Sequence, residues 1–189
     1  MSNFTVLFDA CVLYSMPLSD LVMNLVETGL FRAKWTEAIH QEWIESLLKN
    51  RTDLSRSKLE RRRDNMNLHA EGCLVTNYED LIPSLRLPDP NDRHVLAAAI
   101  RGRADVIVTN NLADFPSDTL KGFGIEAQHP DQFIAHLLSL SPGAVYTAAK
   151  RHRESLRLRP KTVDEYLATL QAAGLPQTVA GLRQFAPLI

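Results

Sequence analysis

Polar side chains that could do chemistry follow two apolar runs of this sequence. Residues 4–8 form the first run, and Asp9 comes directly after it. The second run, residues 105–108, is followed by a polar group: Thr109, Asn110, Asn111 and Asp114. In open α/β folds, ligands bind beyond the carboxyl ends of the parallel strands. We therefore expect these side chains to share one site, although each alone is also typical of a polar turn.

Asp92 is a third candidate, near the start of an expected helix. Asp89 has the position of an N-cap and Pro90 that of the first helical residue. An acid two residues after that proline also suits the helix dipole, which is the structural alternative. However, Leu96 lies four residues further on, so Asp92 begins the apolar face of its helix. A carboxylate facing the core calls for a cation.

Glu42 is the fourth candidate, on a helix that Thr36 should cap and that should reach about Asn50. At ~100° per residue, Glu42 lies ~60° from Ile39, at the edge of the apolar stripe. Glu45 is a rival that we place on the more exposed side. Taken alone, Glu42 would be a solvated side chain, and only the presence of the candidates Asp9 and Asp92 favours a role in the site.

These candidates offer only oxygen ligands. Carboxylate and amide oxygens favour Mg²⁺ or Mn²⁺ over zinc. Several carboxylates together are too negative to stay unneutralised, and such clusters support phosphodiester hydrolysis with one or two metal ions. The pattern thus predicts a metal-dependent hydrolase site.

The elements that must position these residues alternate between strand and helix, which predicts a central parallel sheet of about five strands covered on both faces. The expected strands are 4–8, 31–35, 73–76, 105–109 and 125–128, and the expected helices are 18–28, 36–50, 55–70, 90–101 and one that begins at Pro130. Ser141, Pro142 and Gly143 mark a boundary between residues 1–140 and a basic extension, 141–189. The extension, with short helices at 162–173 and 176–185, is too short for its own core and should pack on the main domain or on a partner.

Composition narrows the class of protein. The 189 residues carry a net charge of −1 and are 45 % hydrophobic, enough for a globular core. There is no apolar run long enough for a membrane span and no signal-peptide pattern at the start, and two cysteines form no framework, so we expect a cytoplasmic protein.

Positive charge is concentrated in two segments. Residues 51–63 hold six basic and two acidic residues, and residues 141–161 hold six basic and one acidic. Such segments can guide a phosphate backbone, although a solvated helix face is the plainer reading. The candidate contacts to such a backbone are Arg61, Arg62, Arg63, Lys150, Arg151 and Arg153.

At these residues the sequence resembles PIN-domain ribonucleases, in particular VapC-like toxins of toxin–antitoxin pairs. The matching pieces are VLFDA at 6–10, WTEAIHQE at 35–42, DRHVLAAA at 92–99, and VIVT at 106–109 with NN at 110–111 and DF at 114–115. The resemblance extends to about residue 138, and the basic tail resembles a subgroup with a small C-terminal domain. It implies a PIN-like α/β/α fold, Mg²⁺ or Mn²⁺ bound by Asp9, Glu42 and Asp92, an RNA substrate, an antitoxin partner and a homodimer.

One position departs from the family pattern. The fourth acid usually lies two residues after the strand-ending threonine, where this chain has Asn111. Asp114 is our candidate for the missing charge, and capping of a turn is its alternative role. The departure also favours a second hypothesis, a non-catalytic PIN scaffold that binds nucleic acid or protein. A phosphatase is a third, disfavoured because Cys11 replaces the second acid of its usual Asp-x-Asp motif.

Overall fold

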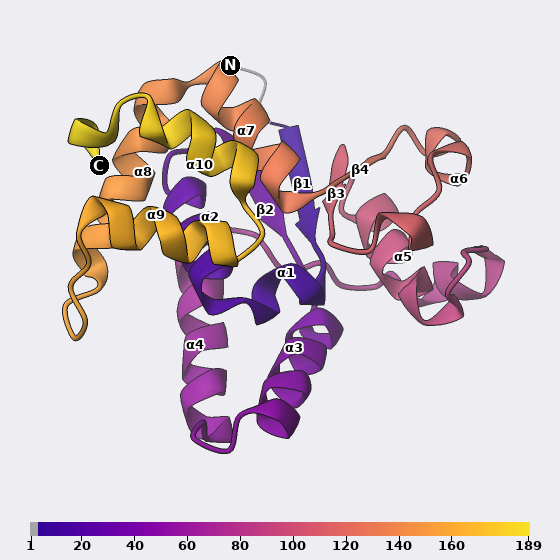
Figure 1. Ribbon diagram of the computed structural model, residues 1–189. Coiled ribbons are helices and arrows are strands. Elements are labelled where there is room, and N and C mark those ends of the chain that lie inside the picture. The colour runs from indigo at the N-terminus through magenta and orange to yellow at the C-terminus, as the bar shows by residue number, and fades with distance from the viewer. Residues whose placement is uncertain (1–3) are drawn as a thin grey trace.

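The computed structural model describes residues 4–189, and its centre is a parallel sheet of four strands (Figure 1). In the order β2-β1-β3-β4, the strands are β2 (Phe31–Lys34), β1 (Phe4–Phe8), β3 (Val106–Val108) and β4 (Glu126–Gln128). Successive side chains of a strand point to opposite faces. Every residue from Thr5 to Phe8 is buried, so both faces of the sheet are covered. The predicted α/β/α architecture with a central parallel sheet is confirmed.

The prediction of a strand at residues 73–76, the third of the five expected, was wrong. The Trp35 N–H donates to the Cys73 carbonyl (3.0 Å) and the Val75 N–H donates to the Trp35 carbonyl (2.9 Å), which makes a single isolated bridge. Asn77 then adopts φ 58°, a left-handed conformation that turns the chain away. A tight turn one residue after Thr76 therefore leaves no length for a strand.

Seven helices of residues 4–140 surround the sheet. They are α1 (Ala10–Tyr14), α2 (Met16–Val26), α3 (Glu37–Asn50), α4 (Arg56–His69), α5 (Arg93–Arg101), α6 (Ser117–Lys121) and α7 (Pro130–Leu140). The helix expected at 18–28 starts earlier than predicted, because the chain turns helical directly after Asp9 and is interrupted only at Ser15. Short 3₁₀ turns at Glu79–Ser84, Pro90–Asp92 and Leu112–Asp114 complete this part.

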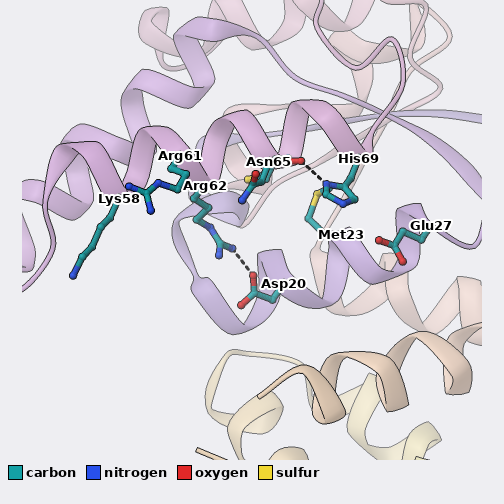
Figure 2. A pocket seen from close by; sticks show the side chains of 9 residues that line it. Asp20, Met23, Glu27, Lys58, Arg61, Arg62, Asn65 and His69 are labelled. Atoms are coloured by element: carbon teal, nitrogen blue, oxygen red, sulfur yellow. Dashed lines mark hydrogen bonds and ion pairs between the residues drawn. The ribbon is translucent and has the colours of Figure 1, made fainter. Parts of the chain in front are cut away.

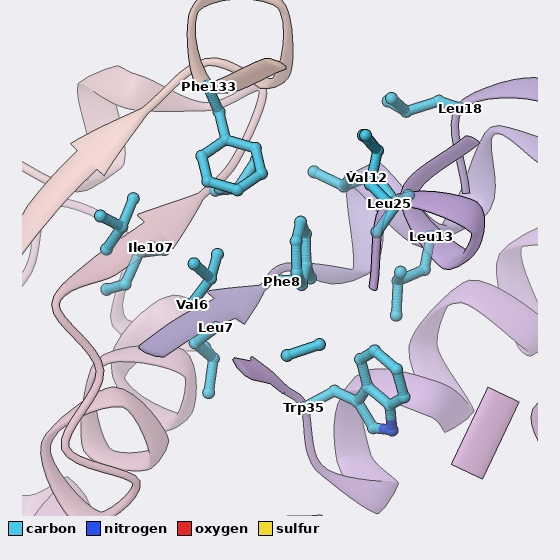
Figure 3. Close-up of a cluster of buried hydrophobic side chains, with 14 of the residues drawn as sticks. Val6, Leu7, Phe8, Val12, Leu13, Leu18, Leu25, Trp35, Ile107 and Phe133 are labelled. Carbon is cyan, nitrogen blue, oxygen red and sulfur yellow. The ribbon is translucent and has the colours of Figure 1, made fainter. Parts of the chain in front are cut away.

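An aromatic cluster joins α7 to the sheet (Figure 3). The ring centroid of Phe133 lies 5.8 Å from that of Phe8 and 5.2 Å from that of Phe31, both nearly edge-to-face. Edge-to-face rings add stabilisation beyond the apolar area they bury. The cluster holds β1 in place up to its last residue, directly before Asp9.

The extension forms three further helices, α8 (Pro142–Ser155), α9 (Val163–Ala172) and α10 (Pro176–Arg183), and a 3₁₀ turn at Ala186–Leu188. As expected, it packs on the main domain, with α8 against α2 and α10 against α7 (Figure 1). The sequence did not predict α8. Within residues 4–189, no helix is both long and apolar enough to cross a membrane.

Candidate metal centre

Asp9 stands at the junction of β1 and α1 and is held from three sides. Its Oδ1 accepts a hydrogen bond from the Ala10 N–H (2.6 Å), as a helix N-cap does. Its Oδ2 accepts hydrogen bonds from the Thr109 hydroxyl (2.7 Å) and the Cys11 thiol (3.0 Å). The carboxylate is only 5 % exposed, so these donors fix its orientation.

Thr109 and its neighbours connect the end of β3 to the end of β1. The Thr109 hydroxyl also accepts from the Asn111 N–H (3.0 Å), and the Asn110 N–H donates to the Cys11 sulfur (3.3 Å). Burial and the charge of Asp9 raise the pKa of Cys11 to about 12, so the thiol keeps its proton for Asp9. Thr109 therefore supports Asp9 directly, and Asn110 supports it through Cys11.

Glu42 pairs with a histidine that the sequence analysis did not assign. On α3, its Oε1 accepts from Nε2 of His94 (2.8 Å), which belongs to the first turn of α5. Burial opposes the charged form of His94. However, the hydrogen bond to Glu42 and the charges of Glu42, Asp9 and Asp92 outweigh it, and the pKa of His94 is raised. Its buried Nδ1 finds no partner within residues 4–189.

Asp92 is the acid whose ionisation the site opposes. Burial, the negative charge of Asp9, and then those of Asp114 and Asp89 raise its pKa to about 6, against a smaller opposing effect of His94. Asp89 caps the turn through its hydrogen bond from the Asn91 N–H (2.8 Å), as expected. Asp92 itself accepts no capping bond, so a cap is not its role.

One cavity of about 480 Å³ collects these acids. The predicted residues that line it are Asp9, Glu42, Asp92 and Asn111, and the others are Ala10, Cys11, Tyr14, Trp43, Ser46 and Asn50. Asp114 does not line it, but lies close enough for its charge to raise the pKa of Asp92. Glu45 is outside the cavity and pairs with Arg56 at 2.7 Å. It is also less exposed than Glu42 (39 % against 47 %), contrary to our expectation.

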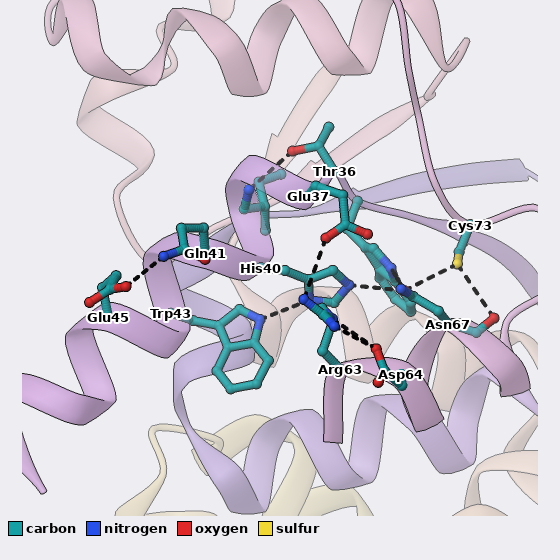
Figure 4. A network of polar contacts seen from close by, with 12 residues as sticks. Thr36, Glu37, His40, Gln41, Trp43, Glu45, Arg63, Asp64, Asn67 and Cys73 are labelled. Atoms are coloured by element: carbon teal, nitrogen blue, oxygen red, sulfur yellow. Dashed lines mark hydrogen bonds and ion pairs between the residues drawn. The ribbon is translucent and has the colours of Figure 1, made fainter. Parts of the chain in front are cut away.

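A polar network fixes α3, and with it Glu42, against α4 (Figure 4). The Oδ1 atom of Asn67 lies 2.9 Å from Nε2 of His40 and accepts from Nε1 of Trp35 (2.7 Å). The Trp43 indole donates to Nδ1 of His40 (3.0 Å), so Nε2 is the protonated nitrogen that donates to Asn67. Burial lowers the pKa of His40 and keeps the ring neutral.

A family profile described as "PIN domain" matches residues 5–113, more than half of the chain, and it includes Asp9, Glu42 and Asp92. The chain belongs to the PIN-domain family. A second profile, "VapC50 C-terminal domain", matches residues 130–184. Over 63 residues the chain is 54 % identical to the "Putative ribonuclease VapC50" of Mycobacterium tuberculosis (strain ATCC 25618 / H37Rv), a segment that covers 33 % of this chain and 37 % of that protein. No solved structure matches.

The donor chemistry of this PIN domain fits a hard divalent cation. The cavity offers carboxylate oxygens, and burial together with the charges of the neighbouring acids disfavours the charged form of Asp92, which a bound cation would stabilise. Within residues 4–189, no three His, Cys, Asp or Glu side chains are grouped closely enough to hold an ion. Glu42 is occupied by His94 instead, which lends the site a partial positive charge.

The six predicted RNA contacts of this PIN domain divide into paired and free cations. Arg62 pairs with Asp20 (2.7 Å), Arg63 with Asp64 (2.8 Å) and Arg151 with Glu27 (3.7 Å), while Arg153 donates to the Lys161 carbonyl (3.0 Å). Of these six, Arg61 and Lys150 alone have no ion-pair or hydrogen-bond partner for their side chains among residues 4–189, and both are exposed.

Proposed function

We propose that this PIN domain is a Mg²⁺- or Mn²⁺-dependent endoribonuclease and the toxin of a type II toxin–antitoxin pair. The observation that carries the proposal is the convergence of Asp9, Glu42 and Asp92 on one cavity, where burial and then the charges of the neighbouring acids raise the pKa of Asp92 to about 6. Raised carboxyl pKa values are typical of sites that hold charge ready for a ligand or a reaction. The name of the mycobacterial relative supports ribonuclease as the activity.

In this proposal the acids bind the cation, and Asp114 adds negative charge from outside the cavity lining. A bound divalent cation would lower the pKa of water and stabilise the negative charge that builds up on the phosphate. Asp9 is already oriented by Thr109 and Cys11 and needs no further ordering. Asn111 contributes a neutral amide oxygen at the rim.

The test is cleavage of a mixed RNA pool with Mg²⁺, with Mn²⁺ and with EDTA. Asp9→Asn should abolish cleavage, because a neutral amide cannot replace the carboxylate that attracts the cation. Asp118→Asn, at a fully solvated carboxyl of α6, is the matched control and should cleave normally. Equal cleavage by wild type in EDTA, or by Asp9→Asn, would refute the proposal.

The partners follow from the same proposal. We infer that the protein acts on RNA in the cytoplasm, forms a homodimer, and is held inactive by an antitoxin encoded beside it. Light scattering of the purified chain tests the dimer. Co-expression with the product of the neighbouring small reading frame tests the antitoxin, which should co-purify and abolish cleavage.

A non-catalytic scaffold is the alternative, and two observations favour it. Asn111 stands where the family pattern has an acid, and within residues 4–189 the acids are not grouped tightly enough to hold an ion. A scaffold would bind RNA or a protein equally well before and after Asp9→Asn and would show no cleavage with either cation.

A further inference from the structure

A second cavity, of about 410 Å³, lies between α2 and α4, apart from the cavity that holds Asp9, Glu42 and Asp92 (Figure 2). It shares no lining residue with the acid cavity. We call it the α2–α4 cleft. Its lining residues are Asp20, Met23 and Glu27 from α2, and Lys58, Arg61, Arg62, Asn65, Met66 and His69 from α4.

The α4 side of this cleft is a row of basic side chains. Lys58, Arg61, Arg62 and His69 follow one another at spacings of three, one and seven residues, which places them along one side of the helix. At 1.5 Å per residue the row is about 16 Å long. Only Leu59 and Met66 of α4 are buried, so core packing does not explain the choice of residues on this side.

The acids of the cleft are already neutralised. Asp20 pairs with Arg62 (2.7 Å), and Glu27 pairs with Arg151, which reaches it from α8 (3.7 Å). Lys58 and Arg61 stay exposed, and no ion pair forms at either within residues 4–189. Figure 2 shows Arg62 turned toward Asp20, whereas Lys58 extends away from it. The cleft therefore offers two cations without an ion-pair partner, Lys58 and Arg61, beside the Arg62–Asp20 ion pair.

The second basic segment of the sequence reaches the same place. A neighbouring cavity of about 560 Å³ shares Asp20 with the cleft and is lined by Arg157, Arg159 and Lys161 of the connection between α8 and α9. The two basic segments, almost a hundred residues apart in the chain, thus meet around Asp20. Folding converts two separate charge clusters into one cationic surface.

We propose that the α2–α4 cleft binds the phosphate backbone of single-stranded RNA, through Lys58 and Arg61, at a distance from the acid cavity. The choice of RNA as the polyanion rests on the proposed function. Free guanidinium and ammonium groups repeated along one helix suit a polymer that repeats its charge, and a guanidinium can bind a phosphate through two hydrogen bonds. An acidic protein segment would also need an apolar anchor. The apolar residues that line this cleft are the half-buried Met23 and the buried Met66, and neither is among the large exposed apolar side chains of the described residues.

The test measures RNA binding without cleavage. A fluorescent single-stranded RNA is titrated in EDTA at 50–200 mM KCl with wild type and with the double variant Lys58→Gln/Arg61→Gln. Each lost phosphate contact to a single strand lowers the slope of log K against log [salt] by about 0.7. The double variant should therefore lose about 1.4 from the slope and bind several-fold more weakly at 50 mM.

The matched control is Lys121→Gln/Arg183→Gln, which removes one lysine and one arginine that are exposed and outside both cavities. Its slope should stay at the wild-type value, and equal thermal melting of all three proteins shows that they are folded. Equal slopes for the two double variants would overturn the proposal. So would unchanged RNA binding by the cleft variant together with loss of binding to polyglutamate, which would indicate an acidic protein partner.

Cleavage of the same RNA with Mn²⁺ separates this inference from the proposed function. Loss of slope in the cleft variant without cleavage by wild type would leave the cleft as an RNA site and reject the nuclease. Cleavage by wild type with an unchanged slope would keep the nuclease and reject the cleft.

Discussion

At the scale of single residues, Asp92 makes the stability of the protein depend on pH. Its pKa is about 6 in the folded chain, mainly because of burial and the charge of Asp9, against about 3.9 when unfolded. The folded state therefore holds this proton more tightly, and the stability that the proton contributes is lost as pH rises from about 4 through about 6.

Asp92→Asn should accordingly stabilise the cation-free protein at pH 7, by about 1 kcal/mol once solvent screening is allowed for. The difference should shrink steadily as pH falls from 7 to about 4, because Asp92 becomes protonated first in the folded and then in the unfolded state. Thermal melting in EDTA from pH 4 to 8 measures it, with Asp118→Asn as the solvated control. A variant less stable than wild type at pH 7 would mean that Asp92 supports the fold.

In our proposal, Asp114 supplies the negative charge that the family pattern places at the position of Asn111. If Asp114 supplies the fourth charge, Asp114→Asn should lower cleavage by orders of magnitude, whereas Asn111→Asp should be tolerated or strengthen cation binding. The Asp114 N–H donates to the Asn111 carbonyl (3.0 Å), so the backbone of this turn survives both changes. Cleavage rates over a Mn²⁺ titration decide, and a normal rate for Asp114→Asn would leave a site of three carboxylates.

At the scale of elements, the hydrogen bond between His40 of α3 and Asn67 of α4 fixes α3 and thereby the position of Glu42. Asn67→Ala would remove the acceptor of two buried donors, Nε1 of Trp35 and Nε2 of His40. Unsatisfied buried donors cost about 1–3 kcal/mol each, so we expect a loss of about 2–4 kcal/mol in unfolding free energy and weaker cation binding. Urea denaturation measures the loss. Asn65→Ala, two residues earlier and exposed, should change stability by less than about 0.5 kcal/mol.

The elements that the sequence predicted are those with local signals. Thr36 caps α3 by accepting from the Ile39 N–H (3.0 Å), and Asp89 caps the turn before α5, both as expected. Asp9 was placed correctly because an apolar strand ends directly before it. The sequence did not predict α8, because basic residues dominate the pattern of 141–161 and its buried side consists of small or isolated apolar residues. Val145, Ala148 and Ala149 belong to that side.

Contacts between distant elements had no such signal. His94 was part of the quoted motif, but its pairing with Glu42 depends on the approach of α3 to α5, which no local pattern encodes. In the sequence, Cys11 served only as an argument against a phosphatase. In the structure its thiol donates to Asp9 and helps to orient that carboxylate. The same holds for the two basic segments, whose meeting around Asp20 is a product of the tertiary fold.

At the scale of the whole molecule, we propose residues 1–140 as the nuclease domain and residues 141–189 as an extension that it needs for stability. The carboxylate of Asp131, on α7, is 2 % exposed and accepts hydrogen bonds from the N–H groups of Gln177 (2.9 Å) and Thr178 (2.8 Å) at the start of α10. The extension thus satisfies a buried charge of the nuclease domain and covers α2 and α7.

Truncation after Leu140 should therefore give a chain that aggregates or melts far below the full-length protein, because it uncovers the apolar sides of two helices and leaves Asp131 without its donors. If the truncated chain does not fold, a single substitution can still test whether the extension stabilises the main domain. Asp131→Ala should remove about 1–2 kcal/mol of capping energy and speed hydrogen exchange in 163–189 more than in the sheet. Asp164→Ala, on the first turn of α9, is the control. A soluble 1–140 fragment that melts cooperatively near the full-length temperature would show that the nuclease domain is stable alone.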